Sequence, residues 1–237
     1  MKKIGIFVSL LALVTFFSNS YAQESRTLSK GFSVNLVVGF PSAEFGAESN
    51  DYVPSSMEYG ALWGLKLGNR WYFAPQEKYG FGLMVNWLDF AAGFKSGTES
   101  YETIYGSTES FDWARTTFDV TLLGVGPIGT IAINDDIAID GYYNLRPTLL
   151  VSGNVSSDPQ GIADDETYGY AGFGITNTLG TAFRWKVLNV GVEYVFGKVN
   201  CQGKYTGPTI TGELEDGDLP DAKLSTNSVR LVLGVKF

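Results

Sequence analysis

The sequence closes with Val229-Arg230-Leu231-Val232-Leu233-Gly234-Val235-Lys236-Phe237, in which every second residue is apolar and the residues between are mixed. Successive side chains of a β-strand point to opposite faces, so a period of two is the pattern of a strand with two different faces. The final residue is aromatic, and the alternation continues up to it. This stretch predicts a strand that meets an apolar environment on one side and a polar one on the other.

The same alternation recurs along the chain, which predicts an all-β fold. Most of these segments are longer than the roughly 9–11 residues that cross a membrane as a tilted strand. Soluble strands average about 5–6 residues. We expect eight strands, at residues 31–40, 57–73, 80–95, 111–133, 137–151, 168–185, 190–198 and 229–237.

The third segment has the least regular alternation, because Asp89 shares a face with Val85 and Trp87 in a simple count of two. The connections between segments alternate in length. Those at residues 74–79, 134–136 and 186–189 are short, and those at 41–56, 96–109, 152–167 and 199–223 are long. Short turns on one side and long loops on the other are typical of outer-membrane barrels.

The composition distinguishes a membrane barrel from a soluble one. A lipocalin-like barrel would bury its apolar face inside and show its polar face to water. The polar face here is rich in Gly, Thr, Ser and Asn but has few Lys and Glu, which is a poor composition for an exterior in water. Charged residues make up 18% of the chain, below the roughly 25% of soluble domains. Bulky aromatics gather near the expected strand ends, as in the girdles at membrane interfaces. These are Trp71, Phe73, Phe183, Trp185 and Phe237 on the short-turn side and Tyr59 and Trp63 near the long loops.

If the apolar face is in lipid, the charged residues of the strands face the lumen. An Arg or Lys on the lipid face would cost about 2–4 kcal/mol at the midplane. Several would cancel a typical folding free energy of about 5–15 kcal/mol, so the opposite orientation is not viable. The predicted lumen charges, which can pair with each other, are Glu58, Lys66, Arg70, Arg115, Asp119, Asp140, Arg146, Glu193, Arg230 and Lys236.

The first residues form a positive Met1-Lys2-Lys3 start, an apolar run and the motif Ser20-Tyr21-Ala22. This is the pattern of a cleaved secretory signal, since the apolar run of about 14 residues is too short to span a membrane. We therefore expect a signal peptide at residues 1–22 and one barrel domain at residues 23–237.

The chemistry that enzymes need is scarce in this chain. There is no histidine, which excludes Ser–His catalysis and His metal ligands. The net charge of −8 argues against nucleic acid as a partner. The single cysteine, Cys201, excludes an intrachain disulfide and leaves an unpaired thiol or an intermolecular link. We expect no catalytic residue, cofactor or metal.

Two acidic stretches offer clustered oxygen atoms. They are Asp164-Asp165-Glu166 and the run from Glu213 to Asp218, both in expected long loops. Hard cations such as calcium bind such oxygens, but the spacing does not match a helix-flanked calcium loop. Solvated surface charge is the favoured interpretation.

Several motifs resemble those of the Bacteroidetes-type outer-membrane β-barrel group, which is similar in architecture to OmpA, OmpX and OmpW barrels. They are residues 67–73 (LGNRWYF), 85–89 (VNWLD), 192–197 (VEYVFG) and 231–237 (LVLGVKF). The resemblance implies an eight-stranded antiparallel up-and-down transmembrane barrel with short periplasmic turns and long extracellular loops. It also implies that Phe237 is read by the barrel-assembly machinery, and it carries no catalytic function.

The leading functional hypothesis is a non-enzymatic barrel of the bacterial outer membrane with periplasmic termini and a largely filled lumen. Its role would be structural or in surface interaction, and its partners membrane lipid, lipopolysaccharide, or an extracellular or envelope protein. One alternative is a narrow channel for ions or small hydrophobic molecules, as in OmpW-like barrels. Another is an accessory subunit of an envelope complex.

Overall fold

The computed structural model describes residues 28–42, 59–73, 78–102, 108–157, 166–208 and 214–237. The expected signal peptide and Glu58 lie outside these residues. The strands are β1 (Gly31–Pro41), β2 (Leu62–Phe73), β3 (Tyr79–Glu102), β4 (Thr108–Ala132), β5 (Ile137–Ser157), β6 (Glu166–Trp185), β7 (Leu188–Pro208), β8 (Leu214–Ser225) and β9 (Ser228–Lys236).

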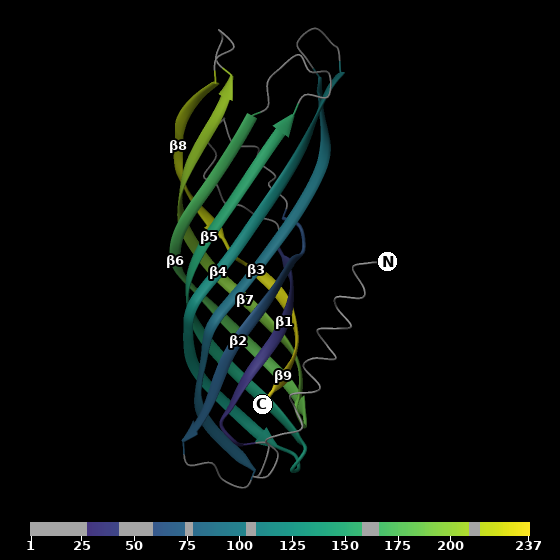
Figure 1. The fold of residues 1–237 in the computed structure, drawn as a ribbon, viewed down its shortest axis with the longest axis vertical. Coiled ribbons are helices and arrows are strands. Elements are labelled where there is room, and N and C mark those ends of the chain that lie inside the picture. The colour runs from purple at the N-terminus through teal and green to yellow at the C-terminus, as the bar shows by residue number, and fades with distance from the viewer. Residues whose placement is uncertain (1–27, 43–58, 74–77, 103–107, 158–165, 209–213) are drawn as a thin grey trace.

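The strands form one closed antiparallel barrel, in which each strand pairs with its neighbour in sequence from β1 to β7. β9 pairs with β7, for example at Leu188↔Val235, and with β1, for example at Pro41↔Ser228. These two pairings close a ring of eight strands (Figure 1). The expected eight-stranded barrel is therefore confirmed. Within the part of the chain that the structure describes, no helix is long and apolar enough to cross a membrane.

β8 and β9 are two parts of one interrupted strand, because both pair with β7. The interruption at Thr226 and Asn227 lies opposite Gly197, whose φ of +142° few other residues adopt. The Gly197 carbonyl accepts a hydrogen bond from the Thr226 amide at 3.0 Å, and the Gly197 amide donates to Asn227 Oδ1 at 3.3 Å.

The barrel is much taller on one side of the ring. Strands β3 to β7 have 20–25 residues each, whereas β1 has 11 and β2 has 12. Much of the sequence expected to form long loops is strand: β7 continues to Pro208 and pairs with β8. We call residues 198–208, β8 and the adjoining ends of β3–β6 the extension, which lies at the top of Figure 1.

The acidic stretch near residue 216 is one of these corrected regions. It was expected in a loop, but Asp216 pairs with Thr206 and Asp218 with Lys204 within the β7–β8 ladder. No group of three or more potential metal-ligating residues occurs among the residues described. Apolar and polar residues alternate only weakly in this stretch, so its sequence did not predict a strand; the stretch is a strand because it pairs with β7.

Two β-bulges reverse the alternation in β3 and β4. Leu67 faces Leu88 but Gly68 faces Asn86, so Trp87 is an extra residue in β3. The register of β4 on β5 shifts between Thr121 and Val125, where Leu123 has a φ of +61°. After an insertion of one residue, every later side chain on the strand changes face. A simple count of two puts Asp89 on the face of Trp87, but the bulge separates them: Asp89 is 2% exposed and lies inside, whereas Trp87 is 47% exposed.

A broad belt of apolar side chains faces outward around the barrel, on every strand of the ring. We call it the apolar band; it covers residues 32–40, 63–73, 79–94, 118–131, 139–155, 173–185, 188–196 and 229–237. Within these ranges no Asp, Glu, Lys or Arg faces outward.

The aromatic side chains expected at the membrane interfaces are mostly on the outside. Those that are exposed are Trp63, Phe73, Phe183, Trp185 and Phe237, and Trp71 is partly exposed. Tyr59 was wrongly expected outside, since it lines a small cavity with the buried Thr117 and Asp119.

Candidate functional site: the charged lumen

The lumen holds the charged side chains of the strands. Nine of the ten residues predicted for it are described, and all nine are at most 5% exposed. Asp89 and Arg184 lie there too, although neither was predicted. The bulge explains Asp89, while Arg184 stands between the outward Phe183 and Trp185, so the simple alternation already pointed to it.

The centre of the lumen is a square of two aspartates and two arginines from four strands. Arg146 Nη2 lies 3.1 Å from Asp89 and 3.2 Å from Asp119. Arg230 donates to Asp89 at 3.1 Å through Nη1 and to Asp119 through Nη2. Each arginine therefore bridges both carboxylates, and the square ties β3, β4, β5 and β9 together across the barrel.

A second group surrounds Asp140 on β5, nearer the short turns. Arg184 donates to its carboxylate through Nε at 2.7 Å and through Nη2 at 2.9 Å, which is a bidentate contact. Arg70 Nη1 donates at 2.9 Å and the Thr130 hydroxyl at 2.6 Å. The carboxylate is 0% exposed, so these donors replace the water that it has lost.

A third group joins β2, β5 and β7. Lys66 is paired with Glu193, and the Tyr142 hydroxyl donates to the same Glu193 Oε1 at 2.7 Å. The Lys66 ammonium also lies 5.7 Å from the centre of the Tyr142 ring.

The two remaining predicted cations, Lys236 and Arg115, lie outside these three groups. Lys236 donates to the Ser29 carbonyl at 2.7 Å, and Arg115 lies 5.7 Å from the Trp113 ring.

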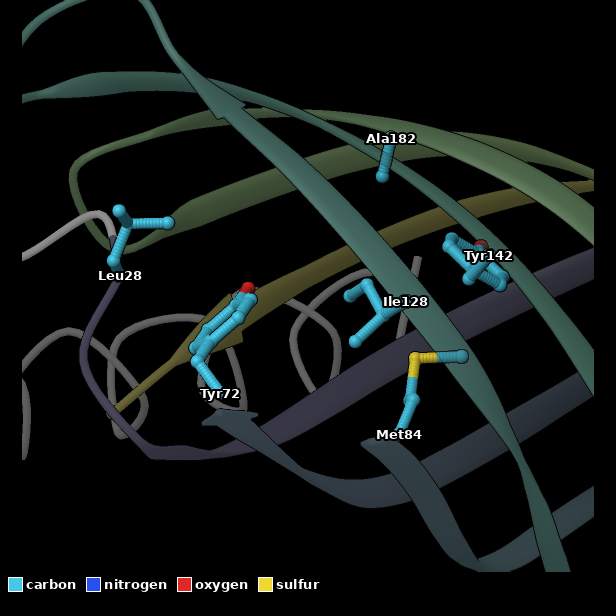
Figure 2. Packing of buried hydrophobic residues seen from close by; sticks show 6 residues of the cluster. All are labelled: Leu28, Tyr72, Met84, Ile128, Tyr142 and Ala182. Carbon is cyan, nitrogen blue, oxygen red and sulfur yellow. The ribbon is translucent and has the colours of Figure 1, made fainter. Parts of the chain in front are cut away.

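Two clusters of apolar side chains also lie in the lumen. Toward the short turns, buried side chains from five strands and the segment before β1 meet in the lumen: Leu28, Tyr72, Met84, Ile128, Tyr142 and Ala182 (Figure 2). Toward the extension the cluster is Leu150, Tyr170, Val199, Cys201 and Leu224. The cavity beside Tyr59 and Asp119 measures only about 20 Å³, which is room for about one water molecule.

Among the described residues, the lumen holds more buried positive than negative charges. The buried cations of the described residues are Lys66, Arg70, Arg115, Arg146, Arg184, Arg230 and Lys236, against Asp89, Asp119, Asp140 and Glu193. Seven against four is an excess of three positive charges, in a chain whose net charge is −8. The arrangement can hold the strands together, and its carboxylates are engaged by cations.

Comparison with solved structures shows what kind of barrel this is. The OmpT outer membrane protease of Escherichia coli aligns with 90% of this chain and 99% of its own, at 10% identity and a TM-score of 0.56. Ail of Yersinia pestis, solved with the heparin analogue sucrose octasulfate, covers 88% of this chain and 97% of its own at 13% identity and a TM-score of 0.39. A major outer membrane protein of Thermus thermophilus covers 88% and 100% at 12% identity and a TM-score of 0.44.

The chain has the β-barrel fold of bacterial outer-membrane proteins. At this identity the likeness concerns the fold alone. No protein-family model matches the sequence, and no curated protein matches it.

Proposed function

We propose that the protein is a non-enzymatic barrel of the bacterial outer membrane that presents the extension to the outside as an interaction surface. The observation that carries this proposal is a reversal of polarity along β7. Up to Phe196 the outward side chains are apolar and the inward Glu193 is charged. Beyond Gly197 the outward side chains are polar, namely Lys198, Asn200, Gln202 and Lys204, and the inward Val199 and Cys201 are apolar.

Such a reversal is expected where the solvent around a sheet changes from lipid to water. In lipid the apolar face must lie outside, and in water it must lie inside. The nine residues 188–196, at about 3.3 Å each and a tilt of about 40°, would cover roughly 23 Å, close to the roughly 25 Å band of known barrels.

Polar side chains on the outside of the apolar band form hydrogen bonds with neighbouring residues, because lipid offers them no hydrogen-bond partner. Trp87 Nε1 donates to Asn69 at 2.6 Å, and the Tyr143 hydroxyl donates to Asn177 at 2.5 Å. The Thr181 hydroxyl donates to the Asp140 carbonyl at 3.0 Å. An outward asparagine facing water would need no such partner.

The packing of the lumen among the described residues favours a structural or surface role over the channel. The ion pairs engage most of the charged groups at the centre, and the two apolar clusters also lie in the lumen. Planar-bilayer recordings of the folded protein, checked by heat-modifiable gel migration, are expected to show no steady openings. Discrete, reproducible openings would support the channel instead.

The orientation can be tested by labelling single cysteines on intact cells. In a Cys201→Ser background, Lys204→Cys on the extension should react with a membrane-impermeant maleimide. Asp135→Cys, in the short turn between β4 and β5, is the matched control, since both positions are exposed. We expect Asp135→Cys to react only after the outer membrane is permeabilised. The reverse pattern would place the short turns and the C-terminus outside the cell.

A further inference from the structure

A hollow interrupts the outer surface of the apolar band near the short turns. It has a volume of about 620 Å³ and is lined by residues of β2, β3, β4, β5 and β6. Its walls are outward apolar side chains, and its floor is formed by backbone where the outward positions of β4 and β5 are Gly129 and Gly141. The walls are Phe73, Tyr79, Phe81, Ile131 and Ile139.

The two glycines make this hollow. They are direct partners across the β4–β5 ladder, so two missing side chains lie next to each other. A Cβ at Gly141 would have no atom within 4 Å, and one at Gly129 would meet only the Gly141 carbonyl oxygen at 4.0 Å. Neither has a φ in the left-handed region, so neither the packing nor the backbone requires glycine here.

The position of the hollow and the charge at its rim indicate what occupies it. It lies among side chains that are 43–63% exposed and apolar: Phe73, Tyr79, Phe81, Ile131 and Ile139. Its edge toward the short turns carries the exposed Lys78, whose carbonyl accepts a hydrogen bond from the Ala132 amide at 2.8 Å. The Tyr79 side chain, which ends in a hydroxyl, is 59% exposed beside it.

We propose that this hollow is a binding site for one phospholipid, whose acyl chain lies over Gly129 and Gly141 and whose phosphate contacts Lys78. A volume of about 620 Å³ is within the roughly 300–1,000 Å³ of ligand sites. Apolar walls next to the cationic Lys78 at the level of the turns match an amphiphile with an anionic head. The proposal rests on the proposed function, because it requires the barrel to be inserted in a membrane.

The test compares two leucine substitutions on the same strand. Gly141→Leu fills the hollow, and Gly153→Leu is the matched control, since Gly153 also faces outward with nothing within 4 Å of its Cβ position. Each protein is reconstituted in vesicles of phosphatidylethanolamine with phosphatidylglycerol and extracted in mild detergent. Lipid retained per barrel is then counted by native mass spectrometry.

We expect one retained phospholipid on the wild type and on Gly153→Leu, and about tenfold lower occupancy on Gly141→Leu, which corresponds to lost contact with about two methylene groups. Lys78→Gln should lower retention of phosphatidylglycerol as well. Equal retention by all four proteins would overturn the proposal. A wild-type dimer that Gly141→Leu converts to a monomer would also overturn it, in favour of a second copy as the occupant.

The outcomes separate this proposal from the proposed function. A barrel that inserts with heat-modifiable migration but retains no lipid contradicts only the lipid site. A chain that fails to insert in vesicles at all contradicts the membrane barrel.

Discussion

The apolar band and the extension are built from the same strands but in opposite senses. The reversal is seen along β7, where the charged Glu193 of the band is inside and the charged Lys204 of the extension is outside. The interior of the band is joined by ion pairs around Asp140 and Asp89, whereas the interior of the extension beside β7 and β8 is the apolar cluster of Val199 and its neighbours. Alternation of side chains gives each strand two faces, and the surrounding solvent determines which face becomes the interior.

The largest expected contrast concerns ion pairs. Asp140→Asn leaves Arg70 and Arg184 buried without their carboxylate, and should lower the free energy of unfolding by about 3–5 kcal/mol. Lys204→Gln breaks the exposed Lys204–Asp218 pair of the extension, where the side chains are 79% and 86% exposed. It should change stability by no more than about 0.5 kcal/mol. Urea unfolding in lipid vesicles measures both, and equal effects would contradict the comparison.

A smaller contrast is expected from one substitution placed on the outside of each region. Leu179→Arg puts a charge in the middle of the apolar band on β6, where Leu179 is 58% exposed, and should cost about 2–4 kcal/mol. Gln202→Arg, on the exposed outer face of the extension, should stay within about 0.5 kcal/mol. The same unfolding experiment applies. If both variants match the wild type, the band does not face lipid.

The third contrast concerns reactivity with little change in stability. Cys201 is 1% exposed inside the extension, and burial raises the pKa of its thiol to about 11. The thiolate is the reactive form, so at pH 8 the folded protein should react with a maleimide roughly a hundredfold more slowly than an ordinary thiol with a pKa of about 8.5.

The rate should rise with pH up to the raised pKa, and it should become ordinary on unfolding in urea. The matched control is Gln202→Cys in a Cys201→Ala background, which moves the thiol one residue to the outer face. Fast labelling of Cys201 in the folded wild type would show that the interior of the extension is open to water.

The prediction of faces from sequence succeeded where alternation was unbroken. On β5 the inward Asp140 and Arg146 follow from a count of two, as do Arg230 and Lys236 on β9. Arg184 obeys the same rule, because it stands between the outward Phe183 and Trp185. Asp89 could not be placed by counting, because its face depends on the extra residue at Trp87. The sequence feature that marks this bulge is two successive apolar residues, Trp87 and Leu88, before the charged Asp89.

Strands with one apolar and one polar face follow from the order of residues alone, because alternation is a local property of a strand. The absence of histidine is likewise a property of the sequence alone. Which charges meet depends on the folded barrel, in which Arg146 and Arg230 reach Asp89 and Asp119 from other strands. The height of the extension and the hollow over Gly129 and Gly141 also depend on the folded barrel, because strand pairing and register involve residues far apart in the chain.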